Sequence, residues 1–174
     1  MAILNVEFKA SCIDLAAAEN RLLAHNPVLK GTDHQVDTYF NVSHGRLKLR
    51  EGAIENALIH YERGNTSGSK SSKVLLYQCQ PDENLKEVLS NALGIKVVVD
   101  KLRKIYFIAN VKFHFDRVKT LGTFVEVEAI DRDGTIGSEK LQEQCDHYAR
   151  ILNVAATDYI AGSYSDMILM QQDK

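Results

Sequence analysis

The feature that most constrains this chain is an alternation of charged and apolar residues in several short segments. It runs through residues 5–9, 46–50, 101–103 and 125–129, where every second side chain is charged or polar. Successive side chains of a β-strand point to opposite faces, so this spacing predicts strands with one polar and one apolar face. A helix would scatter the same residues around its whole circumference. We therefore expect a fold made mainly of strands.

Helical spacing is confined to a few segments between and after these strands. The expected helices cover residues 15–25, 83–93, 139–153 and 158–170, and Asp14, Asp82 and Ser138 are the expected caps of the first three. About eight strands, separated by turn residues, make up most of the rest. No internal repeat or linker divides the sequence. These features predict a single α+β domain over residues 1–174, with an antiparallel sheet.

The charges on the polar faces are sorted by sign. Arg46, Lys48 and Arg50 form one basic row and Lys101 with Arg103 another, whereas Glu126 and Glu128 form an acidic pair and Glu7 with Lys9 a mixed one. Two interpretations fit. The rows could be solvated faces with weak salt bridges. Alternatively, the sheet closes into a barrel of about eight strands, which is wide enough for a small ligand. The rows would then point inward, and the apolar faces of the strands would pack outward against helices.

Inward rows of both signs would suit a phosphate compound with a divalent metal. Lysine and arginine bind phosphate oxygens, and carboxylates bind Mg²⁺ or Mn²⁺, which bridges to the phosphate. The net charge of −2 gives no reason to expect nucleic acid or a membrane surface as a partner. Three scattered cysteines do not form a disulfide or zinc pattern. Without a signal peptide or a long apolar run, a cytoplasmic location is expected.

Five segments in order resemble one known family. They are NVEFK at residues 5–9, DTYFNVSHGRLKLRE at 37–51, HYER at 60–63, VDKLRKIYF at 99–107 and DRVKTLGTFVEVEA at 116–129. NVEFK resembles the E-x-E-x-K signature of the CYTH superfamily, which groups class IV adenylyl cyclases with thiamine triphosphatases. The similarity spans residues 5 to about 166.

The resemblance implies an eight-stranded antiparallel barrel, a triphosphate tunnel, flanked by helices and containing Mg²⁺ or Mn²⁺. Because the similarity is greatest to class IV adenylyl cyclases, it implies a metal-dependent enzyme that converts ATP to cyclic AMP and pyrophosphate. The alternative is hydrolysis of inorganic or thiamine triphosphate, as in other members. A protein that binds a triphosphate or polyphosphate without turnover is a third alternative. By match to the motifs, Glu7, Glu126 and Glu128 would be the catalytic metal ligands. The phosphate-binding residues would be Lys9, Lys48, Arg50, Arg63, Lys101 and Arg103.

Several positions leave alternatives open. The first acid of the signature is Asn5 here, whose amide oxygen can ligate a metal but carries no charge, so a second metal would bind weakly. Strict alternation groups Arg63 with apolar Ile59 and Tyr61, so a bulge would be needed to turn it inward.

The remaining polar candidates have less specific expectations. Lys70 and Lys73 beside the Gly/Ser-rich loop either close over the tunnel or are solvated. Asp37 and Asp116 either orient basic side chains or a water, or make structural hydrogen bonds, and the structural role is the one expected. The expected partner is a small-molecule triphosphate, and a homodimer is compatible with the sequence.

Overall fold

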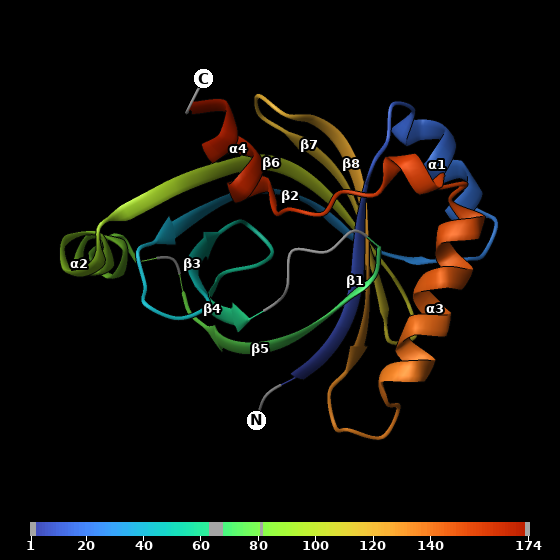
Figure 1. Cartoon of the computed structure of the whole chain (residues 1–174), viewed down its shortest axis with the longest axis horizontal. Helices are drawn as coiled ribbons and strands as arrows, with labels where there is room; N and C mark the ends of the chain where they lie inside the picture. The colour runs from blue at the N-terminus through green and yellow to red at the C-terminus, as the bar shows by residue number, and fades with distance from the viewer. Residues whose placement is uncertain (1–2, 63–67, 81, 173–174) are drawn as a thin grey trace.

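Eight antiparallel strands close into one barrel in the computed structural model, which describes residues 3–62, 68–80 and 82–172 (Figure 1). The order around the barrel is β1-β5-β4-β3-β2-β6-β7-β8. The strands are β1 (Ile3–Ser11), β2 (Val28–Phe40), β3 (Arg46–Glu51), β4 (Ala57–Glu62), β5 (Lys70–Gln78), β6 (Ile95–Ile108), β7 (Val111–Val118) and β8 (Gly122–Asp131). This confirms the predicted α+β class and the antiparallel eight-stranded barrel.

Four α-helices flank the barrel. They are α1 (Leu15–Leu23), α2 (Glu83–Leu93), α3 (Ser138–Ile151) and α4 (Tyr164–Gln172), with a 3₁₀ turn η1 (Ala156–Asp158) before α4. Figure 1 shows α1 and α3 on one side of the barrel and α2 projecting at the opposite side. Helix α4 packs near β6. The helices therefore cover only part of the outer wall.

The main hydrophobic core lies outside the barrel, between the wall and the helices α1 and α3. The apolar faces of β1, β7 and β8 supply residues such as Phe8, Phe113 and Val127, each at most 1% exposed. Leu22 of α1 and Leu141 of α3 pack against them. Because these strands bury their apolar side against helices, their charged side has to face the barrel interior.

Strands β4 and β5 are an exception to the expected orientation. Ala57, Ile59 and Tyr61 of β4 line the interior cavity, together with Val74 and Leu76 of β5. The expectation that apolar faces point outward is therefore wrong for these two strands. Ala57, Ile59 and Tyr61 belong to a buried cluster that also contains Tyr39 of β2, and the partly buried Val74 packs against it.

Two helix predictions also need correction. The cap of α3 is Gly137 and not Ser138, which is the first helical residue; no side chain caps this helix. The expected terminal helix over 158–170 is instead η1 followed, after a break, by α4. The cap predictions at Asp14 and Asp82 are confirmed, because each carboxylate accepts a hydrogen bond from a backbone N–H in the first turn.

Candidate functional site in the charged barrel interior

The barrel encloses a cavity of about 680 Å³. Among the described residues, eight Lys and Arg side chains and five Asp and Glu side chains line it. Buried charge on this scale is costly unless it is paired or liganded. The excess of positive charge fits an anionic ligand.

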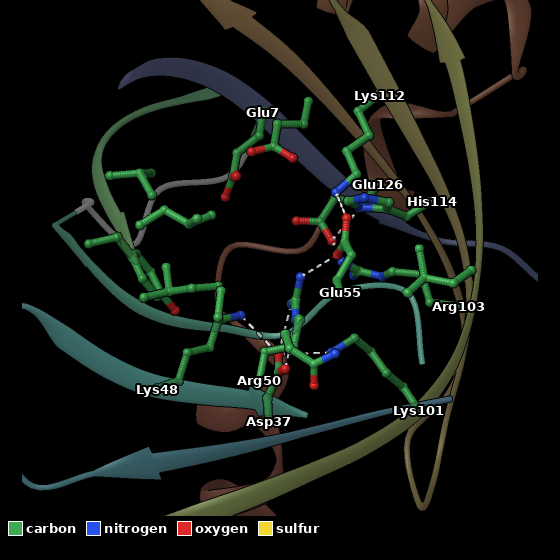
Figure 2. A pocket seen from close by; sticks show the side chains of 18 of the residues that line it. Glu7, Asp37, Lys48, Arg50, Glu55, Lys101, Arg103, Lys112, His114 and Glu126 are labelled. Carbon is green, nitrogen blue, oxygen red and sulfur yellow. Dashed lines mark hydrogen bonds and ion pairs between the residues drawn. The ribbon is translucent and has the colours of Figure 1, made fainter. Parts of the chain in front are cut away.

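A basic cluster of Lys48, Arg50 and Lys101 surrounds the carboxylate of Asp37 (Figure 2). Arg50 donates from Nε and Nη2 to the two Asp37 oxygens at 2.8 and 2.9 Å. Lys48 and Lys101 donate to Asp37 Oδ2 at 2.9 and 2.8 Å. The register pairs Asp37 with Arg50 across β2 and β3, and Lys101 reaches it from β6. One carboxylate thus positions three cations.

The electrostatics of this cluster favour a further anion. Burial opposes ionisation of Asp37, but Arg50, Lys101 and Lys48 hold its pKa well below the usual value. Burial lowers the pKa of Lys101 well below its usual value, and the neighbouring Arg50 and Arg103 act in the same direction. Asp37 acts in the opposite direction, and since Lys101 is 2% exposed, a bound polyanion would add to that effect and raise the pKa of Lys101.

Glu55 joins the basic cluster to the far wall of the cavity. Its carboxylate accepts from Arg50 Nη1 at 3.0 Å and pairs with Lys112 of β7. Gln35 of β2 donates to the same carboxylate at 3.0 Å. Burial opposes ionisation, yet Lys112 and Arg50 lower the pKa of Glu55. Glu55 is therefore an internal anion that lies between two cavity cations.

The loop that carries Glu55 is fixed by Asp33, which is fully buried. The Asp33 carboxylate accepts from the backbone N–H groups of Ala53, Ile54 and Glu55 at 2.7–3.0 Å. Gly52 approaches Asp33 so closely that an added Cβ would lie 2.6 Å from the carboxylate. The backbone at Glu55 is thus held in place by the fold.

An acidic cluster of Glu7, Glu126 and Glu128 lies on the neighbouring strands β1 and β8. The register pairs Glu7 with Glu128 and Lys9 with Glu126. Like charges paired across strands repel. Burial, with repulsion from Glu7, Glu126 and Glu55, raises the pKa of Glu128 to about 7 although Lys112 acts in the opposite direction.

Glu126 differs from Glu128 because cations already surround it. Arg103 donates to it at 2.8 Å, and Lys9 lies 3.6 Å away. Burial opposes its ionisation, but these two cations hold the pKa of Glu126 well below the usual value. Burial, with Arg103 and Lys112, lowers the pKa of the adjacent His114 to about 3, so this histidine is neutral.

Arg103 is fixed from a second side by Asp116. Two donors of the guanidinium meet the two Asp116 oxygens at 2.7 and 2.6 Å. Tyr164, at the start of α4, donates to the same carboxylate at 2.7 Å. Asp37 and Asp116 therefore both orient basic side chains, which was the less favoured of the two roles expected for them.

The donor set of the acidic cluster fits Mg²⁺ or Mn²⁺. It offers carboxylate oxygens, and the buried Asn5 Oδ1 has no hydrogen-bond partner among the described residues, while its amide donates to Glu128. In residues 3–62, 68–80 and 82–172, no three His, Cys, Asp or Glu side chains already converge as a metal site. The cluster therefore supplies ligands that would have to adjust around a cation.

The structure brings most of the residues predicted from the sequence into one cavity. Those that line it are Glu7, Lys9, Lys48, Arg50, Lys101, Arg103, Glu126 and Glu128. Arg46 belongs to the same row but turns to Asp166 of α4 at 2.9 Å. Arg63 lies outside the described residues. Lys73 is exposed and alternates with the cavity-lining Ser72 and Val74, so it lies on the outer face.

The cavity residues that were missed from the sequence include Glu55, Lys112 and His114. Lys112 and His114 alternate with apolar residues of β7, in the same pattern that identified the other rows. The alternation in β7 could therefore have identified Lys112 and His114 from the sequence. Glu55 lies in the loop between β3 and β4, where no periodicity marks it.

A closed barrel with helices on its outside and sorted charges inside defines a class of small tunnel proteins. The CYTH domain family matches residues 4–164, so the chain belongs to the CYTH family. This confirms the resemblance seen in the sequence. None of the curated proteins is similar enough in sequence to match this chain.

Solved structures of low sequence identity share the fold. A Pyrococcus horikoshii protein has a TM-score of 0.79 at 22% identity, covering 93% of this chain and 98% of its own. A proposed adenylate cyclase from Vibrio parahaemolyticus has a TM-score of 0.79 at 16% identity, covering 95% and 98%. A proposed adenylyl cyclase from Hippeastrum with a dominant triphosphatase activity has a TM-score of 0.60 at 14% identity, covering 100% and 97%.

A helix that crosses a membrane needs about 20 mostly apolar residues. Within the described part of the chain, no helix is long and apolar enough to cross a membrane.

Proposed function

We propose that this protein is a metal-dependent triphosphatase that hydrolyses a small-molecule triphosphate inside the barrel. The observation that carries the proposal is the basic cluster: three cations share one buried carboxylate and face an acidic cluster across a single cavity. A row of phosphates suits the first group, and a divalent cation suits the second.

The basic cluster would hold the phosphate chain. Lys48, Arg50 and Lys101 are already oriented by Asp37, so binding requires little reorganisation of these side chains. Their charges also oppose the negative charge that gathers on the leaving diphosphate. Arg103 and Lys9 lie beside Glu126 and would contact the part of the phosphate chain nearest the acidic cluster.

Glu7, Glu126 and Glu128 would hold Mg²⁺ or Mn²⁺, with the Asn5 amide oxygen as a further donor. When bound, such an ion neutralises phosphate charge and polarises the phosphoryl group. Because Asn5 contributes no charge, we expect one divalent ion to bind strongly in the cluster.

Hydrolysis requires the fewest additional groups. The oxygen of a water molecule bonds to the terminal phosphorus, the bond from that phosphorus to the bridging oxygen breaks, and phosphate and a diphosphate leave. The proton lost by the water ends in solvent. The triphosphatase activity named for the Hippeastrum relative supports this reaction, as does the family.

Cyclisation of ATP is the second candidate, and the apolar wall of the cavity favours it. Ile59, Tyr61, Val74 and Leu76 line the side formed by β4 and β5, where a base could pack. In this reaction the ribose 3′-oxygen bonds to the α-phosphorus and pyrophosphate leaves. The Vibrio relative is a proposed adenylate cyclase.

Product analysis separates these reactions. The protein is incubated with Mn²⁺ and, separately, tripolyphosphate, thiamine triphosphate and ATP, and the products are resolved by chromatography. Phosphate with a diphosphate product supports the triphosphatase, whereas cyclic AMP with pyrophosphate supports the cyclase. Glu126→Gln and Glu128→Gln should each abolish turnover in a folded protein. Full activity in both variants would contradict the assignment of the acidic cluster.

A further inference from the structure

A pair of residues outside the predicted set, Glu55 and Lys112, spans the cavity between the basic and the acidic clusters. Lys112 belongs to the cavity face of β7, where the register pairs it with Glu128 of β8. Its ammonium pairs with the Glu55 carboxylate, and its side chain is 12% exposed. On the other side, Glu55 accepts from Arg50 at 3.0 Å.

The Glu55 carboxylate therefore marks an anion position. It has two oxygens, a negative charge and contacts to an arginine and a lysine, which are the contacts that a phosphate group makes. Figure 2 shows it between Arg50 and Lys112 in the middle of the cavity. The position lies between Arg50 of the basic cluster and Lys112, which the register pairs with Glu128 of the acidic cluster.

We propose that Lys112 is a phosphate-binding residue and that Glu55 occupies its phosphate position until a triphosphate displaces it. Lys112 also supplies a built-in positive charge beside Glu128, so part of the triphosphate affinity does not depend on metal. This inference rests on the proposed function of the cavity, because it assigns residues to the same triphosphate.

The proposal predicts that neutralising Lys112 and neutralising Glu55 change the triphosphate affinity in opposite directions. Removing the charge of Lys112 removes a ligand contact and weakens binding. Removing the charge of Glu55 removes a competing anion and strengthens it. A pair that only stabilises the fold would weaken binding when either partner is changed, because each change leaves the other charge without its partner.

The experiment is a calorimetric titration of the non-hydrolysable imido analogue of tripolyphosphate, in EDTA and again in Mn²⁺. Lys112→Gln should weaken binding about 10-fold or more in EDTA and by a smaller factor in Mn²⁺. Glu55→Gln should tighten binding about 3-fold or more in both buffers. Lys119→Gln changes an exposed lysine just after β7 and should leave binding unchanged.

Far-UV circular dichroism checks that each variant is folded. The double variant Glu55→Gln/Lys112→Gln is a further control, because it has no unpaired charge in this pair. Its affinity in EDTA should lie between those of the two single variants. Weakening by both single variants, or no effect of Lys112→Gln, would overturn the inference while leaving the proposed function intact. If the native protein binds the analogue in neither buffer, the proposed function fails as well.

Discussion

The basic and the acidic clusters of the cavity differ in how many of their charges are paired with opposite charges of the protein. In the basic cluster, Asp37 makes four hydrogen bonds with three cations and keeps a strongly lowered pKa. In the acidic cluster, Glu7 and Glu128 are paired across β1 and β8, and the pKa of Glu128 is raised to about 7. One region is an assembled network, whereas the other contains opposing like charges.

This difference indicates which ligand each region would bind. The basic cluster is preorganised, so a phosphate chain can bind without rebuilding it. The acidic cluster retains repulsion that an added cation would relieve. Removing the charge of Asp37 should therefore destabilise the first region, whereas removing the charge of Glu128 should stabilise the second.

The largest effect is expected from Asp37→Asn. Three cations, two of them buried, would lose their shared anion, and breaking a buried ion pair costs about 3–5 kcal/mol. Urea denaturation at pH 7 measures the free energy of unfolding. Asp146→Asn, on the exposed face of α3, is the matched control and should change it by less than about 0.5 kcal/mol. A loss below about 1 kcal/mol for Asp37→Asn would show that the network is not a buried, stabilising one.

Low pH should reduce the difference in unfolding free energy between the native protein and Asp37→Asn. The folded-state pKa of Asp37 is lowered, so its contribution to stability is complete above its unfolded pKa of about 4 and disappears as pH falls through the folded value. The stability gap between the native protein and Asp37→Asn should be constant from pH 7 to about 5 and narrow below about 4. Denaturation curves at pH 7, 5 and 3 measure it; a gap that persists unchanged at pH 3 would contradict the assignment.

A smaller effect is expected on binding from Arg50→Ala. Losing a charge-assisted contact to phosphate should weaken tripolyphosphate binding by about 1.5–3 kcal/mol. Arg46→Ala removes a member of the same row that pairs with Asp166 instead of lining the cavity, and should leave binding unchanged. Calorimetric titration of both variants compares them directly. Equal losses would mean that the whole row, and not the cavity, determines affinity.

The smallest effect is expected from Glu128→Gln, which should raise the free energy of unfolding where Asp37→Asn lowers it. The amide keeps an oxygen that accepts from Asn5 but removes one charge facing Glu7. In metal-free buffer at pH 8 the free energy of unfolding should rise by about 0.5–1 kcal/mol. Denaturation in EDTA provides the measurement. A fall in stability would show that the acidic cluster is as fully assembled as the basic one.

The sequence predicted that these charged residues share one face of each strand because a strand has a period of two, and this period does not depend on neighbouring strands. Residues such as Lys48, Arg50 and Glu126 were found in this way. That the face points inward was one of two interpretations. Partnerships between strands depend on register, which no local pattern encodes. The contact of Asp37 with Lys101, 64 residues away, is one example.

Two features were beyond the reach of alternation. Glu55 lies in a loop whose position is set by hydrogen bonds to Asp33, so its approach to Arg50 requires the folded barrel. The apolar faces of β4 and β5 were expected outside because helices usually cover apolar residues. Here the cavity itself has an apolar wall, and Ile59 and Tyr61 face inward.

The most direct test of the two-region interpretation is the coupling between metal and triphosphate. The affinity of imidotriphosphate is measured by calorimetry with and without Mn²⁺, in the native protein and in Glu128→Gln. We expect Mn²⁺ to tighten binding about 10-fold or more in the native protein and less than about 3-fold in the variant. Equal affinities with and without Mn²⁺ in the native protein, or the same tightening in Glu128→Gln, would contradict a cation site in the acidic cluster.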